Sequence, residues 1–298
     1  MIDRKGTLSF LAITFFLTYL IEGLLILSGF RITGVPAIQG QLVVAGVMWV
    51  PALATFITIK FITRESFAIT NLRFGSWKPY LATWIIIPVC FFLIYALTWL
   101  SKLGEPDWQL NELMALMAST GADMSTAPSP STVTTALFFA SLFVSPLINS
   151  VFGFGEEFGW RGYLLPKLLP LGKSRSYILL GIIWGLWHAP LIMVGFIAPD
   201  HPALGILAML ALTTTIGLYI NELTLKYHSS ILAGWIHGVF NSQSYGIWRL
   251  LFMPMNPLIG GLYGLVGLLV WLVLGLLTVR FVNAPIEPYI PSEDVALG

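Results

Sequence analysis

Long apolar runs recur along the whole chain, and they constrain its fold more than any other feature. A helix that crosses the hydrocarbon core of a bilayer needs roughly 20 mostly apolar residues. Eight such runs lie at residues 8–29, 41–62, 79–100, 133–154, 176–197, 203–221, 229–246 and 257–281. Only 10% of the 298 residues are charged, whereas soluble domains carry about 25%. The sequence therefore predicts an all-α, polytopic membrane protein with about eight transmembrane helices.

The basic residues are distributed unequally between the predicted loops. If the N-terminus is cytoplasmic, the inner segments hold Arg4, Lys5, Lys60, Arg64, Arg73, Lys78, Arg161, Lys167, Lys173, Arg175, Lys226 and Arg280. The outer segments then hold Arg31, Lys102 and Arg249. Cytoplasmic loops are enriched in Lys and Arg, so both termini are predicted to be cytoplasmic. The membrane would be the cell membrane of a prokaryote or the endoplasmic reticulum of a eukaryote.

The chain is predicted to form one transmembrane domain over residues 1–282, followed by a polar tail over 283–298 that is expected to be disordered. Apolar residues at helical spacing in the outer loop 101–132 predict a short interfacial helix there. A net charge of +1 gives no indication of a nucleic-acid partner. The single cysteine, Cys90, excludes an internal disulfide and a cysteine-based metal cage.

Two acidic residues and an arginine follow the fourth apolar run. Ionisable groups are costly in a bilayer, and they persist mainly where they pair or carry a function. Glu157 and Arg161 are four residues apart, so they share a helix face and are expected to form an ion pair. Glu156 points about 100° away from Glu157, which leaves it free to face a cavity. The alternative is a solvated charge cluster at a helix end.

Two histidines lie inside the fifth and seventh runs. His188 follows Trp184 by one turn, and Pro190 interrupts the backbone hydrogen bonds there, which would open room for water. His237 and Asn241 project from one helix face as hydrogen-bond donors, which suits the stabilisation of an oxyanion. Each pair alone also fits polar packing between helices. With a glutamate from a third helix, they predict a carboxylate–imidazole site that activates water.

The order of these motifs resembles a known family. Glu156-Glu157-x-x-x-Arg161, then Trp184-x-x-x-His188, then His237-x-x-x-Asn241 is similar to the CAAX-protease and bacteriocin-processing family, over about residues 130–245. Its members include the CAAX prenyl endopeptidases, and the family is described as eight-helical. The resemblance implies that Glu156 and His188 activate the hydrolytic water and that His237 and Asn241 bind the oxyanion. It also implies that Glu157, Arg161 and Trp184 are supporting residues.

The resemblance leaves the use of a metal open. Glu156, His188 and His237 would make a three-ligand zinc site with an open fourth position. The remaining candidate for a general base would then be Glu157, which Arg161 is expected to occupy. A metal-free mechanism without a cofactor is therefore favoured, and zinc is the alternative.

Taken together, the residues predict an intramembrane endopeptidase. It would hydrolyse a peptide bond near the cytoplasmic membrane face, in a peptide or membrane-protein substrate that is lipidated or not. One alternative is a non-catalytic membrane scaffold or immunity protein of the same fold. A proton-coupled transporter is the other, and it would use the same residues as a relay. Transporters usually show long internal repeats, whereas the echo between Gly185–His188 and Gly234–His237 is four residues long.

Overall fold

The computed structural model of the chain describes residues 3–32, 38–119, 121, 123–252 and 255–286. Over this part the regular structure is helical, without a strand, and the predicted all-α fold is confirmed. The α-helices are α1 (Arg4–Leu27), α2 (Ile38–Val47), α3 (Val50–Ile57), α4 (Lys78–Leu100), α5 (Asn111–Ser119), α6 (Pro130–Phe139), α7 (Ser145–Glu157), α8 (Leu165–Leu168), α9 (Lys173–Trp187), α10 (Ala189–Met193), α11 (Pro202–Tyr227), α12 (Ser230–Ser244), α13 (Ile247–Leu251) and α14 (Leu265–Val282). Short π-helical segments are η1 (Thr58–Thr63), η3 (Ala140–Val144) and η4 (Phe158–Leu164), and 3-10 segments are η2 (Phe67–Thr70) and η5 (Leu169–Leu171).

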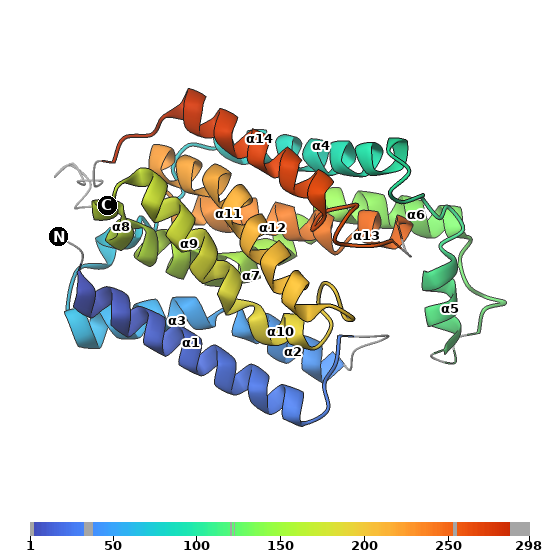
Figure 1. Cartoon of the computed structure of the whole chain (residues 1–298), viewed down its shortest axis with the longest axis horizontal. Helices are drawn as coiled ribbons and strands as arrows, with labels where there is room; N and C mark the ends of the chain where they lie inside the picture. Colours follow the sequence, from blue (N-terminus) through green and yellow to red (C-terminus); the bar gives the residue numbers. More distant parts are fainter. Residues whose placement is uncertain (1–2, 33–37, 120, 122, 253–254, 287–298) are drawn as a thin grey trace.

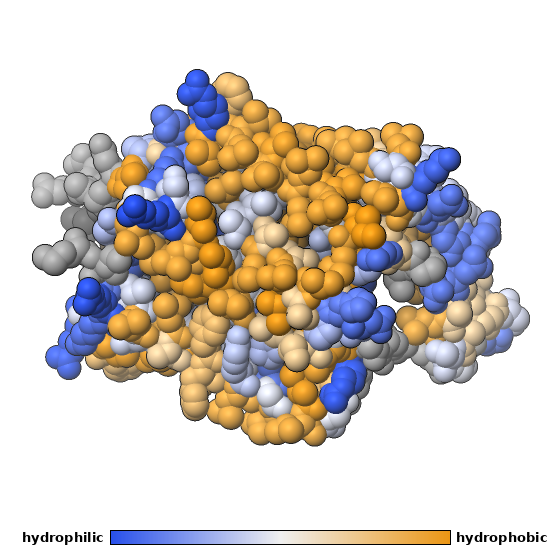
Figure 2. Space-filling view, in the orientation of Figure 1, coloured by the Kyte–Doolittle hydropathy of each residue, from blue (hydrophilic) through white to orange (hydrophobic). Residues whose placement is uncertain are grey.

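The molecule has the surface of an integral, multi-pass membrane protein. Within the described residues, six helical segments are long and apolar enough to cross a bilayer: Arg4–Leu27, Gly40–Thr63, Lys78–Leu100, Pro130–Leu171, Pro202–Tyr227 and Leu265–Val282. The long helices run roughly along the longest axis (Figure 1). Apolar side chains cover most of the face in Figure 2, and polar ones gather toward the two ends of that axis. This arrangement matches an apolar belt between two polar surfaces.

The two other predicted crossings are shorter than expected. The fifth run is divided into α9, α10 and a break between them at His188, and the seventh run is α12. α9 and α12 have 15 residues each. At about 1.5 Å per residue they are shorter than the roughly 30 Å hydrocarbon core. Both therefore depend on their neighbours for their place in the bundle, and both carry a histidine of the candidate site.

The fourth run is longer than its predicted bounds of 133–154. Helical structure continues from Pro130 to Leu171 through the charged motif, so Glu156 lies inside a helix and not at its end. The reason is that the charges compensate one another. Glu157 and Arg161 form an ion pair within the helix. Because each charge has a partner, both side chains can be buried away from solvent. π-Helical segments flank α7 on both sides, and they adjust the direction in which its side chains point.

α7 and α12 form the closest helix pair around the site, and glycine allows the approach. A β-carbon added to Gly153 of α7 would lie 3.0 Å from the backbone oxygen of Gly234 and 3.0 Å from Cβ of His237, both on α12. α11 packs against both α9 and α14. The long helix α11 thus packs against α9, and it also contacts α12.

Outside the bundle, two expectations can be compared with the structure. The short helix predicted in the loop 101–132 is present as α5, which Figure 1 shows beside the body of the protein. At the start of the tail, Ala284 is buried, and its N–H donates to Glu222 while its carbonyl accepts from Lys173 Nζ at 2.8 Å. The first tail residues are thus anchored by side chains. Residues 287–298, where disorder is expected, lie outside the described part.

Candidate active site

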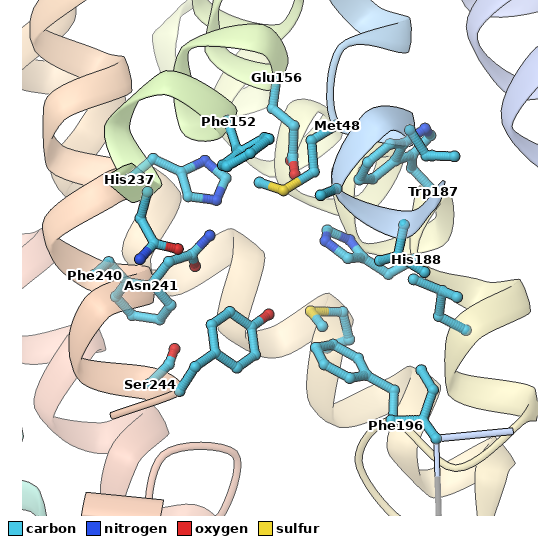
Figure 3. Close-up of a pocket in the computed structure, with 18 of the residues that line it drawn as sticks. Met48, Phe152, Glu156, Trp187, His188, Phe196, His237, Phe240, Asn241 and Ser244 are labelled. Carbon is cyan, nitrogen blue, oxygen red and sulfur yellow. The ribbon is translucent and has the colours of Figure 1, made fainter. Parts of the chain in front are cut away.

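The three motifs meet at one cavity of about 700 Å³. Figure 3 shows Glu156 of α7, His188 at the end of α9, and His237 and Asn241 of α12 around this space. Glu156 is 2% exposed, His237 5% and Asn241 6%, whereas His188 is half-buried. All four residues that were predicted to act on water or on the oxyanion are therefore brought together by the fold. Their roles in a reaction stay predictions.

Glu156 is held by the tryptophan that precedes His188 by one turn. Trp184 Nε1 donates a hydrogen bond to Glu156 Oε2 at 2.8 Å. The Trp184 ring also lies against the imidazole of His237, with the ring centroids 5.5 Å apart. The predicted supporting role of Trp184 thus has a structural basis, because this one side chain contacts both the carboxylate and an imidazole.

The expected ion pair between Glu157 and Arg161 is present and has further partners. Arg161 Nη1 lies 2.9 Å from both carboxylate oxygens of Glu157, and both side chains are buried. Arg161 Nε donates to Asn221 Oδ1 of α11 at 2.9 Å, and the guanidinium lies over the Trp184 ring. Arg161 therefore ties α7 and η4 to both α9 and α11.

Glu157 also contacts His237, which the sequence does not indicate. Nδ1 of His237 lies 2.9 Å from Glu157 Oε1. Since the carboxylate accepts, Nδ1 carries the proton and Nε2 is the nitrogen that remains for other partners. Neutral His237 would accept a hydrogen bond at Nε2, and only its protonated form would donate one to an oxyanion. With that proton, the charges of Glu156, Glu157, Arg161 and His237 sum to zero.

The break between α9 and α10 orients His188. Pro190 has no N–H to give to the carbonyl of Leu186, and Tyr19 Oη of α1 donates to that carbonyl at 2.7 Å. Nδ1 of His188 lies 2.9 Å from the carbonyl oxygen of Trp184, which only accepts. The proton of neutral His188 is thus on Nδ1, and Nε2 is an acceptor. An acceptor at this place is suited to take a proton from water.

The metal alternative has a geometric requirement, which is that the ligands converge. Among the side chains that the structure describes, no group of three or more His, Cys, Asp or Glu residues is gathered closely enough to hold a metal ion. Glu156, His188 and His237 line one cavity but do not form such a group. The zinc alternative would therefore require these three side chains to move closer together, and removal of metal ions tests it.

The cavity extends toward one end of the bundle. Its lining includes Ile32 beyond α1, Phe196 beyond α10, Tyr245 beyond α12 and Arg249 in α13. The charge distribution predicts that these segments lie on the outer side of the membrane. In that orientation this end of the cavity lies away from the basic end, whereas the sequence analysis predicts cleavage near the cytoplasmic face.

Two groups of this site escaped the sequence analysis. Asn221 completes the contacts of Arg161, and Glu22 of α1 lines the cavity. Both are polar residues inside long apolar helices, which is the signal that singled out Glu156 and the histidines. Glu22 lies early in the chain and alone in its apolar run, whereas Glu156 and the two histidines belong to polar motifs in the second half.

Comparison with known proteins supports the resemblance drawn from the motifs. Residues 131–243 match the model of a family described as type II CAAX prenyl endopeptidase Rce1-like. The predicted resemblance to the CAAX prenyl endopeptidases is confirmed. The Rce1-like region contains the catalytic and supporting residues that the motifs predict, from Glu156 to Asn241, but neither Glu22 nor Arg249.

A short segment also matches a curated protein. Over 40 residues the chain is 50% identical to CAAX prenyl protease 2 of Methanococcus maripaludis. The aligned segment covers 13% of this chain and 15% of the length of that protein. The match therefore concerns a small part of each, and it supports the Rce1-like assignment without extending it beyond the matched region.

Proposed function

We propose that the protein is an intramembrane endopeptidase that hydrolyses a peptide bond inside the cavity between α7, α9 and α12. The single observation that carries the proposal is that Glu156, His188 and His237 line one cavity, with Glu156 and His237 almost fully buried. The similarity to the Rce1-like family supports the reaction class, and it suggests a CAAX motif, prenylated or not, as the first substrate to test.

In the proposed reaction, Glu156 and the Nε2 atom of His188 orient a water molecule. Glu156 accepts a proton from this water as its oxygen attacks the peptide carbonyl. The hydrogen bond from Trp184 leaves one oxygen of Glu156 for this task. The proton then passes to the nitrogen of the leaving amine as the carbon–nitrogen bond breaks. A positioned base of this kind contributes about 10²–10⁴-fold to a rate.

His237 and Asn241 would stabilise the negative charge on the carbonyl oxygen. They are four residues apart on α12 and line the same cavity. His237 donates from Nε2 only when it is protonated, and the Glu157 carboxylate at its Nδ1 balances that charge. We propose that Glu157 is a positioning residue for His237, in addition to its structural pairing with Arg161.

This proposal is tested on cells that contain either the native protein or Glu156→Ala. The C-termini and N-terminal leaders of cellular peptides and membrane proteins are compared by mass spectrometry. The proposal expects a defined set of peptides that keep an intact terminus only in the variant. Identical termini in both cell populations would instead favour a non-catalytic scaffold of the same fold.

Activity is expected to survive removal of metal ions. If Glu156 acts as the base without zinc, purified protein dialysed against a strong chelator keeps its rate of peptide hydrolysis within about twofold. The measurement is the hydrolysis rate before dialysis, after dialysis, and after zinc is added back. A rate that is lost to the chelator and restored by zinc would contradict the metal-free mechanism while leaving the peptidase proposal intact.

The side of the membrane from which substrate enters is open to a labelling experiment. Tyr245 lines the outer end of the cavity and is 48% exposed, and Ser76 is exposed in the loop before α4. In a Cys90→Ala background, Tyr245→Cys is expected to react with a membrane-impermeant thiol reagent from the outer side of cells. Ser76→Cys, the matched control, should react only after the membrane is opened.

The opposite pattern of labelling would reverse the predicted orientation. The end of the cavity that Tyr245 lines would then face the cytoplasm. That orientation would agree with cleavage near the cytoplasmic membrane face, which the sequence analysis predicts. With the orientation that the basic residues predict, we propose entry of the substrate from the outer end, with Glu156 at the deep end of its path.

A further inference from the structure

A carboxylate outside the Rce1-like region lines the cavity. Glu22 of α1 is 1% exposed and belongs to the cavity wall together with Glu156 and His188. Its Oε2 atom is buried and has no hydrogen-bond partner within the described part of the chain. The family motifs give this residue no role, and the mechanism above does not use it.

The position of Glu22 is fixed by neighbouring contacts. Thr18 lies one turn earlier on the same face of α1, and its hydroxyl accepts a hydrogen bond from Trp187 Nε1 at 2.7 Å. The Trp187 ring in turn lies edge-on against the His188 imidazole, with centroids 4.8 Å apart. Tyr19 holds α1 to the carbonyl of Leu186 at the helix break. Glu22 is therefore held on the same wall as His188.

Other buried acids of the bundle have donors, in contrast to this oxygen of Glu22. Glu157 pairs with Arg161, and Glu222 accepts from Lys173, Tyr177 and the backbone of Ala284. A buried acceptor without a donor costs free energy, more so when it is charged. Structural packing alone would be served better by an apolar side chain. The cost is offset when a ligand brings the missing donor into the cavity.

The charges around the cavity indicate what that donor is. Glu22 and Glu156 both line the cavity, and Arg161, which follows Glu156 by five residues, is already bonded to Glu157 and Asn221. Arg249 also lines the cavity but is exposed. A cationic group of the substrate would both supply the donor and reduce the excess of negative charge in a medium of low dielectric constant.

We infer that Glu22 is a specificity-determining residue that binds a lysine or arginine side chain of the peptide substrate close to the scissile bond. This inference rests on the proposed peptidase function, because it assigns one wall of the same cavity to substrate recognition. It adds a residue of α1 to a site whose other residues come from the Rce1-like region.

The test uses pairs of peptides in which one position carries either lysine or its uncharged isostere norleucine. The substituted position is changed from one pair to the next, along both sides of the cleaved bond. The native protein is expected to prefer lysine at one position. Glu22→Gln should lower kcat/KM for that lysine peptide by about 10- to 100-fold and change the norleucine peptide little. Glu112→Gln, the same substitution on exposed α5, should keep the preference. A preference that is unchanged in Glu22→Gln overturns the inference.

A binding measurement separates this inference from the proposed function. In a Glu156→Gln background, the affinities of dye-labelled lysine and norleucine peptides are measured by fluorescence polarisation, with and without Glu22→Gln. Loss of the lysine preference with Glu22 supports the inference even when no peptide is hydrolysed, whereas equal affinities overturn it. If Glu22→Gln does not fold, Glu22→Asp retains the charge on a shorter side chain and is expected to show a weaker lysine preference. A preference as strong as that of the native protein would overturn the inference.

Discussion

Glu156→Gln protein is expected to fold like the native chain and to hydrolyse peptides about 10²–10⁴-fold more slowly. The amide keeps the shape of the carboxylate and retains an oxygen that accepts from Trp184 Nε1, so the contact that orients the side chain survives. The amide does not accept a proton from water at neutral pH. The loss should therefore appear in kcat, while the thermal midpoint of unfolding stays within a few degrees of the native value.

The matched control for this variant is Glu112→Gln, which makes the same chemical change on the exposed helix α5. It should leave both the rate and the unfolding midpoint unchanged. A Glu156→Gln protein that is folded and as active as the control would exclude Glu156 as the general base. His188, whose Nε2 atom is an acceptor, would then be the next candidate for the base.

Arg161→Ala is expected to destabilise the protein by about 3–5 kcal/mol. The substitution removes both hydrogen bonds to Glu157 and the bond to Asn221, and all three groups are buried. The Glu157 carboxylate is left with His237 as its partner in a nearly dry interior. The measurement is the free energy of unfolding in mixed micelles, or the thermal midpoint together with the yield of monodisperse protein.

Two further variants identify the physical cause. Arg161→Ala combined with Glu157→Gln removes the uncompensated charge, so the double variant should be more stable than Arg161→Ala alone. Arg175→Ala removes an exposed cation from the start of α9 and should change stability by no more than about 0.5 kcal/mol. A well-folded but inactive Arg161→Ala protein would contradict the structural role and would point to substrate binding.

Features that depend on local spacing could be predicted from the sequence. The apolar runs predicted the helical membrane fold, because a segment that crosses a bilayer must satisfy its backbone hydrogen bonds internally. The four-residue spacing of Glu157 and Arg161 gave their ion pair. Pro190 gave the interruption next to His188, because a proline in a helix removes one N–H donor wherever the helix lies.

Features that depend on which helices touch could not be predicted. The hydrogen bond between His237 and Glu157 joins residues that are 80 positions apart, and it exists because glycines allow α7 and α12 to approach closely. The predicted fourth run ends at residue 154 because apolar residues define its bounds, whereas the helix continues through Arg161, which finds Asn221 on another helix and stays buried. Neither partner is visible from spacing within one segment.

Glu22 illustrates a further limit of local reasoning. A single acid in an apolar run signals a function or a partner, but the run itself does not tell which helix it faces. The structure places Glu22 on the wall of the cavity through contacts of its neighbours Thr18 and Tyr19 with the end of α9. Those contacts are made with the Trp187 side chain and the Leu186 carbonyl, more than 160 positions away in the chain.

The most direct test of the central claim is the hydrolysis of a CAAX-containing peptide by purified, reconstituted protein in water that carries a heavy oxygen isotope. Prenylated and unprenylated forms of the peptide are compared, with native protein, Glu156→Gln and Glu112→Gln. The account predicts that native protein and Glu112→Gln release a product whose new carboxylate contains one heavy oxygen, and that Glu156→Gln releases almost none. Product of equal amount and labelling from Glu156→Gln would contradict the account.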